Sequence, residues 1–303
     1  MCHALSAESI LEHRYATLHL DTPSDSTAVV SAITITRTQL ITRLRDSLSY
    51  RPNIYVVTSV SRFDSLLGGK FPDWGAAAAL PEEGLIIIKS PAAFNLGKSL
   101  EELTSHEYSH LALAHKLGFL VAPRWFDEGL AMLVSTEWGW EDNLAMSRAV
   151  LFGQTIPLAE IDRVNRFSEG QAHVAYAESY LAVKYLYDNY QVNGVMLFLN
   201  ALLAGEAIDS ALVKSIGSTY AGFEKEFHQW LKERYTITNL FMDTIYFWMF
   251  LAIVLIAGVI LSYRRRRSVY KRWEKEEELE SKDFDYGDSD NPEQIDDDEP
   301  WRQ

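Results

Sequence analysis

The segment from Ile245 to Tyr263 is the feature that most limits how this chain can fold. Its sequence, IYFWMFLAIVLIAGVILSY, carries no charged residue and is apolar almost throughout. About 20 such residues in a helix, at ~1.5 Å each, span the ~30 Å hydrocarbon core of a bilayer. Tyr246 and Trp248 lie near one end, where aromatic rings favour the headgroup level. The sequence therefore predicts one transmembrane helix, residues 244–263.

The basic run that follows this segment predicts its orientation. Arg264–Arg267 should lie in the cytoplasm by the positive-inside rule, so the residues before Asp243 are expected outside a cytoplasmic membrane. A buried core helix is the alternative, but such a helix gains nothing from an arginine flank. The first twenty residues lack the basic start and apolar stretch of a signal peptide, and we therefore expect the natural start to lie upstream of Met1.

Charge divides the rest of the chain. The formal net charge is −14, and most of it lies after Trp273. Residues 264–303 are expected to form a basic, then acidic, disordered cytoplasmic tail, either a solvated spacer or a docking site for a partner. The expected order before the span is an N-terminal segment with the first strand (1–25), a folded domain (26–235) and a linker (236–243). Because the folded part is mildly acidic, nucleic acid is excluded as a partner.

Hydrophobic periodicity predicts strands and helices early and only helices later. The expected strands are His13–Asp21, Asn53–Val60 and Leu85–Lys89. The expected helices are Ser26–Leu48, Lys98–Leu117, Arg124–Glu137, Glu141–Phe152, Gln171–Tyr190, Val192–Ala204 and Tyr220–Arg234. This order predicts an α+β fold, a small mixed sheet followed by a helical lobe.

The helix expected at Lys98–Leu117 contains the motif His106-Glu107-Tyr108-Ser109-His110, or HExxH. A spacing of four residues puts both imidazoles on one face, where each can bind a single zinc at ~2.0–2.1 Å. Glu107 is rotated by ~100° from His106, so its carboxylate lies beside the metal as a base for a zinc-activated water. The alternative is three polar residues on the wet side of an amphipathic helix, and a third ligand would decide between the two.

Three residues are candidates for that third ligand. His115 would need a longer zinc motif with Gly at position 113 and His at position 116, but these positions hold Leu113 and Lys116. His173 is so distant in sequence that only a structure could place it. Glu128 lies eighteen residues after His110. A tight return at Gly118–Pro123 would pack its helix against the first and bring Glu128 to the metal. Three protein ligands leave the open fourth position of a catalytic zinc.

HExxH followed by Trp125-Phe126-Asp127-Glu128-Gly129-Leu130-Ala131 resembles the gluzincin metallopeptidases, the clan of thermolysin and the zinc aminopeptidases. The likeness is greatest to the bacterial peptidase MA-like family. Looser matches extend it over most of residues 10–235, and they are Phe71–Ala77, Gly84–Pro91, Ala175–Tyr180, Val183–Leu186 and Phe223–Leu231. The resemblance implies a thermolysin-like minimal catalytic core with a zinc cleft.

The resemblance also implies roles for single residues. It places one zinc per chain on His106, His110 and Glu128, with Glu107 as base and later proton donor. Two tyrosines on one helical face compete as oxyanion donor, Tyr176 first and Tyr180 as its rival.

Two further roles concern the surroundings of the metal. The strand Leu85–Lys89 would be the edge strand that pairs with an extended substrate backbone. Asp127 would orient a ligand histidine, unless it is only a solvent-facing acid.

One departure from the clan narrows the expected activity. The zinc aminopeptidases carry G-x-M-E-N in the strand before HExxH, and its Glu holds the substrate's free amine. The strand Leu85–Lys89 contains no acid, and Glu82 and Glu83 precede it as loop charges. We therefore expect an endopeptidase-like enzyme acting on peptides or proteins. The alternatives are a silent membrane adaptor working through the acidic tail and a zinc hydrolase of non-peptide amides.

Overall fold

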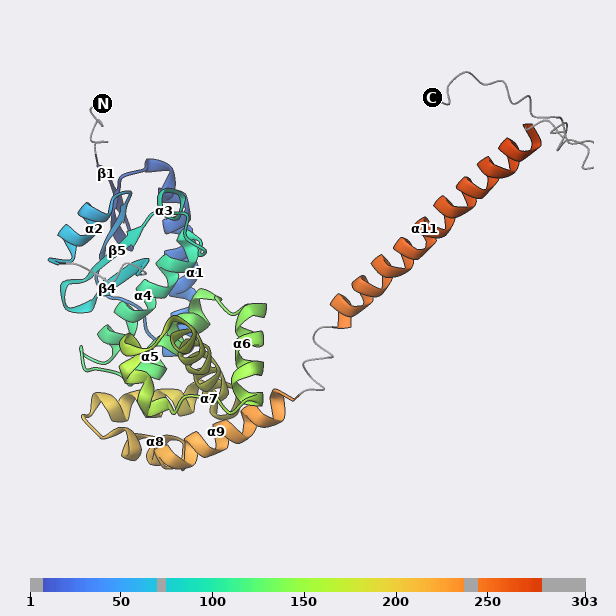
Figure 1. The fold of residues 1–303 in the computed structure, drawn as a ribbon. Helices are drawn as coiled ribbons and strands as arrows, with labels where there is room; N and C mark the ends of the chain where they lie inside the picture. The colour runs from blue at the N-terminus through green and yellow to red at the C-terminus, as the bar shows by residue number, and fades with distance from the viewer. Residues whose placement is uncertain (1–7, 70–74, 237–244, 280–303) are drawn as a thin grey trace, which may run out of the picture. The chain divides into compact units, whose positions relative to one another are not determined.

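A five-stranded mixed sheet is formed within the residues that the computed structural model describes, which are 8–69, 75–236 and 245–279 (Figure 1). Its strands are β1 (Ser9–His13), β2 (Ala16–Leu20), β3 (Asn53–Val57), β4 (Ala77–Leu80) and β5 (Leu85–Lys89). Their order in space is β1-β2-β3-β5-β4. The three central strands run parallel, and β1 and β4 are antiparallel to their neighbours. The α+β fold with a small mixed sheet is confirmed.

The edge-strand prediction is wrong. The backbone of β5 pairs with β3 on one side and with β4 on the other, so it has no free edge for a substrate. The turn Pro81–Glu83 reverses the chain, with Gly84 in the left-handed region at φ 62°. This lets Ala77–Leu80 lie antiparallel to β5 and become the edge. Within the described residues, no strand pairs with the outer side of β4.

The strand expected at His13–Asp21 is observed as β2, and β1, which precedes it and forms a hairpin with it, was not predicted. A two-residue turn at Arg14–Tyr15 separates β1 from β2, and Leu11 pairs with Leu18. The guanidinium groups of Arg14 and Arg37 lie 4.3 and 4.2 Å from the centre of the Tyr15 ring. These cation–π contacts stabilise the turn.

Helices cover both faces of the sheet. On one face α1 (Ser26–Leu44) and α4 (Leu100–Lys116) pack together, and α4 also contacts β4 and β5 (Figure 1). Side chains that alternate along the strands, such as Ile54 and Ile86, are buried in this main core. On the other face α2 (Val60–Leu66), which was not predicted, buries Phe63 against β3 and β5. The sheet is therefore the middle of three layers.

The C-terminal part of the same unit is helical, as expected. Its helices are α5 (Arg124–Ser135), α6 (Trp140–Leu151), α7 (Glu169–Leu203), α8 (Ile208–Ile216) and α9 (Tyr220–Arg234). Two helices were expected where α7 runs, and Gln191 breaks it there with φ 54° and ψ −177°. The short helices α3 (Pro91–Phe94) and α8 were not predicted.

The last described helix, α11 (Ile245–Leu279), belongs to a second unit, Phe241–Gln303. Its stretch Trp248–Trp273 is long and apolar enough to cross a membrane, and none of it is buried within the protein. The helix continues through the arginine run to Leu279, whereas disorder was expected from residue 264. The predicted linker (apart from Thr236), the acidic end of the tail and most of the family-matched segment Phe71–Ala77 lie outside the described residues.

Candidate metal centre

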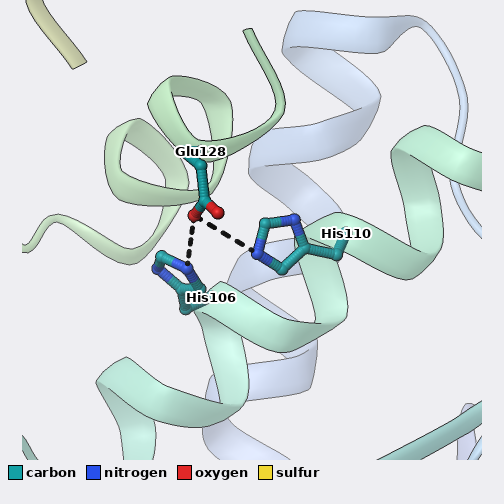
Figure 2. Close-up of side chains that lie close together, drawn as sticks. All are labelled: His106, His110 and Glu128. Atoms are coloured by element: carbon teal, nitrogen blue, oxygen red, sulfur yellow. Dashed lines mark ion pairs between the residues drawn. The ribbon is translucent and has the colours of Figure 1, made fainter. Parts of the chain in front are cut away.

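Three potential metal ligands converge where α4 meets α5 (Figure 2). His106 and His110 lie one turn apart on α4, and Glu128 of α5 points between them. The Oε2 atom of Glu128 lies 3.5 Å from Nε2 of His106 and 3.8 Å from Nε2 of His110. One ligand atom from each residue fits within 4.8 Å of the other two. The structure thus brings together the three residues that the sequence indicated.

The start of α4 is stabilised by the capping box that the sequence contains. The hydroxyl of Ser99 accepts a hydrogen bond from the backbone N–H of Glu102 (3.1 Å), and the Glu102 carboxylate accepts one from the Ser99 N–H (2.6 Å). This capping box satisfies donors that would otherwise be free at the start of the helix. Further along, Arg37 donates to the hydroxyl of the fully buried Tyr108 (3.0 Å). The helix that carries both histidines is therefore held at its start and in its middle.

The return from α4 to α5 delivers Glu128. Gly118 and Phe119 both adopt left-handed backbone conformations, with φ of 60° and 64°, and Pro123 precedes the first residue of α5. Next to the ligand, Gly129 lets α5 approach α7 closely, because a Cβ there would lie 2.1 Å from the backbone oxygen of Ser179. This close contact sets how deep Glu128 sits.

A carboxylate holds each histidine from behind. Nδ1 of His110 lies 2.7 Å from Asp127, as predicted, and Nδ1 of His106 lies 2.7 Å from Glu137. Since each carboxylate accepts a hydrogen bond from the imidazole, each Nδ1 carries a proton and each Nε2 is turned toward Glu128. Glu137 was not predicted. The available signal was that a ligand histidine almost always has such a partner, but sequence did not indicate which acid.

Glu137 is itself held firmly. Lys98 contacts one of its carboxylate oxygens at 2.5 Å, and the hydroxyl of Ser135 donates to the other at 2.7 Å. Burial raises the pKa of Glu137, but the charges of His106 and Lys98 outweigh it and leave that pKa well below its ordinary value. The carboxylate is therefore ionised across the physiological range.

The carboxylates control the charge of both histidines in the metal-free protein. Burial lowers the pKa of His106, but Glu137 and Glu128 outweigh this and raise it well above 6.5. Burial has the same effect on His110, whose pKa is raised to about 9 by Asp127 and Glu128. A metal ion must therefore displace protons from these nitrogens when it binds.

The two glutamates of the group differ in charge state. Burial raises the pKa of Glu107 above its ordinary value, against the opposing charges of His110 and His106. Burial also acts on Glu128, but the hydrogen bond from His106 and the charge of His110 outweigh it and lower that pKa to about 2. Arg124 adds an ion pair to Oε1 of Glu128 at 3.3 Å. Glu128 is thus suited to bind a cation and Glu107 to exchange a proton.

The structure separates the two tyrosines that sequence could not. Burial and the charges of Glu128 and Glu107 raise the pKa of Tyr176 to about 12, against the charge of Arg124 and a hydrogen bond with it. Tyr176 therefore interacts with Arg124, which also pairs with the ligand Glu128. Tyr180 instead stacks on Trp138, with ring centres 4.5 Å apart and planes at 13°.

The other candidate ligands lie elsewhere. The Nε2 atom of His115 is 2.9 Å from the hydroxyl of Ser49, and Nε2 of His173 is 2.9 Å from Asp142. Neither belongs to the group of three. The decision for Glu128 over both histidines agrees with this arrangement.

A pocket of about 350 Å³ opens beside His110 and Asp127. Its walls are mainly apolar and come from the end of β4, the end of α4 and the loop to α5, with Glu82 and Glu83 from the turn after β4. The apolar residues lining it include Leu80, Leu113, Leu117, Phe119 and Leu120. Such a pocket suits an apolar group with a positive charge nearby.

Replacing Glu137 with glutamine is expected to weaken zinc binding by about 10–100-fold, because the amide holds the Nδ1 proton of His106 less strongly. The measurement is zinc affinity by competition with a chromophoric chelator. The matched control is Glu101→Gln, an exposed acid on α4. Equal affinities of the Glu137 variant and the parent would contradict the role given to Glu137.

Comparison with known proteins agrees with this geometry. A family model for the peptidase MA superfamily matches residues 7–233, which includes α4, α5 and α7. A comparison with curated proteins gave no match.

Proposed function

Because the chain belongs to the peptidase MA superfamily, we propose that it is a membrane-anchored, zinc-dependent peptidase. One observation carries the proposal. The Nε2 atoms of His106 and His110 face the same oxygen of Glu128 at 3.5 and 3.8 Å, while a carboxylate holds each imidazole from behind. This is the arrangement of a metal site with oriented ligands rather than of a surface ion pair.

The donor set fits zinc. Two imidazole nitrogens and one carboxylate oxygen are ligands that zinc prefers, and a tetrahedral ion with bonds of ~2.0–2.1 Å separates its ligands by roughly 3.3–3.4 Å. The separations of 3.5 and 3.8 Å lie close to that value. Three protein ligands also leave one position for a substrate or water, which is typical of a catalytic site.

When bound, zinc supplies a water of lowered pKa and polarises the carbonyl under attack. Glu107, buried beside the ligands, takes the proton from the attacking water. The same carboxyl then returns the proton to the leaving amine as the peptide C–N bond breaks, so the products are one carboxylic acid and one amine. Tyr176 donates its hydroxyl proton in a hydrogen bond to the oxygen on which charge develops.

The edge strand and the pocket support a peptide substrate. The free side of β4 suits an extended backbone, which would add to the sheet as a further strand. We infer that the pocket beside His110 receives one apolar substrate side chain, and that Glu82 and Glu83 favour a positive charge near it. A substrate that pairs with β4 and also fills the pocket would bind through several consecutive residues, as the interior of a peptide does. This favours endopeptidase activity.

Membrane attachment completes the proposal. The apolar stretch of α11 would anchor the peptidase in a cytoplasmic membrane. Arg264–Arg267, at the end of the apolar segment, would face the cytoplasm and leave the metal group outside.

The full chain, purified in detergent, is expected to hold one zinc per chain by elemental analysis. Glu128→Ala and His110→Ala should each lower the zinc content strongly, because two ligands hold zinc far less well than three. Glu101→Ala on the exposed side of α4 should leave it unchanged. A folded parent without zinc would contradict the proposal and would favour the adaptor alternative.

A further inference from the structure

One face of α6 is apolar and exposed. Trp140 and Phe152 are each 72% exposed, and Leu144 and Leu151 are each 38% exposed. Trp140, Leu144 and Leu151 are spaced so that they lie along the same side of the helix, and Phe152 is the residue directly after it. The opposite side of α6 packs inward, with Met146 and Ala149 buried. The exposed set, here called the α6 face, is therefore an amphipathic surface and not part of the core.

Charged residues flank the α6 face. Arg148 is exposed one turn from Leu144 and Leu151, and Glu141 is exposed next to Trp140. Exposed Trp, Leu and Phe with a flanking arginine are residue types found in helices that lie in a membrane interface. Trp favours the headgroup level because its ring is apolar and its N–H is polar.

The chain leaves the domain next to α6. Tyr235 follows α9 directly and is 5% exposed. Its hydroxyl donates to Oδ1 of Asn143 on α6 at 3.3 Å, and α9 contacts α6. Only residues 236–244 then precede the first residue of α11, Ile245. Nine extended residues reach roughly 30–32 Å, so the length of the chain keeps the start of the span within about that distance of Tyr235.

From the exposed face and the short tether we propose that the α6 face docks into the surface of the bilayer that α11 spans. Trp140, Leu144, Leu151 and Phe152 would enter the boundary between headgroups and acyl chains, with Arg148 beside the lipid phosphates. The proposal rests on the membrane anchoring proposed above. It also has a consequence for substrates. Glu137, which holds His106, lies just before α6, so docking keeps the ligand group close to the membrane surface.

The test uses the full chain in vesicles of phosphatidylcholine and phosphatidylglycerol. One set of vesicles carries a lipid quencher near the headgroup, and a second set carries one at the end of the acyl chain, which reaches the middle of the bilayer. In a Cys2→Ser background, Leu144→Cys is labelled with a polarity-sensitive fluorophore. We expect a blue-shifted emission and strong quenching by the labelled lipid. Val213→Cys on α8, where the side chain is 46% exposed, is the matched control and should be quenched several-fold less.

A label at Val254→Cys, within the apolar stretch of α11, separates the two proposals. Quenching at 254 with equal, weak quenching at 144 and 213 would overturn docking and leave anchoring intact. Failure at 254 as well would overturn both. A blue shift at 144 without lipid quenching would mean that protein, such as a second copy, covers the face, and would also overturn docking.

A second variant tests whether the exposed apolar side chains themselves cause the docking. The pair Trp140→Asp and Phe152→Asp changes two exposed side chains, so the fold should persist and zinc content should stay as in the parent. With both changes, quenching of the label at 144 is expected to fall to the level at 213, while the label at 254 is unaffected. Unchanged quenching at 144 would contradict docking through this face.

Discussion

Replacing Glu107 with glutamine is expected to lower kcat/KM for peptide hydrolysis by about 10²–10⁴-fold while zinc stays bound. Glutamine keeps the shape of the side chain but cannot take a proton. Glu107 is 9% exposed, so solvent has little access to replace it with another base. The Nε2 atoms of His106 and His110 remain available to the metal, because Glu137 and Asp127 orient these histidines without help from Glu107. The loss should therefore appear in kcat and not in zinc content.

The measurement uses the full chain in detergent and a set of internally quenched peptides. Each peptide carries one large apolar residue, with or without an adjacent lysine, to match the pocket that includes Glu82 and Glu83. Glu101→Gln serves as the control for removal of one negative charge from α4. If the Glu107 variant cleaved these peptides at the parental rate, the activity would belong to another residue or to a contaminant.

The parts of the fold that sequence predicted are those with local signals. The bounds of α9 and β5 were predicted as observed, and α4 begins at its capping box. The strand β4 was missed because its sequence, AAAL, has no preference for extended structure. It is a strand only because the turn Pro81–Glu83 folds it against β5. Because β4 was missed, β5 was taken as the edge strand, although β4 covers its outer side.

The candidate site also has a part that local sequence signals predict and a part that depends on long-range packing. His106, Glu107 and His110 share one helix, so their spacing fixes their relation, and Glu128 follows after one short return. Glu137 could not be chosen from sequence, because no fixed spacing links it to His106 and it follows the last turn of α5. The position of the two tyrosines relative to the ligands depends on how α7 packs on α5, a long-range contact that includes Gly129 and the backbone of Ser179.

Tyr176→Phe is expected to lower kcat by about 10²–10³-fold with little change in KM, while Tyr180→Phe stays near the parent. The pKa of Tyr176 is raised by burial to about 12, so its hydroxyl keeps its proton at neutral pH and can donate a hydrogen bond. Phenylalanine retains the buried ring and removes only that donor. Because the substrate carbonyl needs this donor most when charge develops on its oxygen, the effect should fall on kcat.

Tyr180 is the matched control for this prediction. It lies one turn further along α7, and its ring stacks on Trp138 at 4.5 Å, so Tyr180→Phe removes a hydroxyl from the same helix and keeps the stack. Zinc content and thermal midpoint of both variants should equal those of the parent. Equal losses in the two variants would indicate a general effect on α7. A larger loss at Tyr180 would make it the oxyanion donor and would contradict the role given to Tyr176.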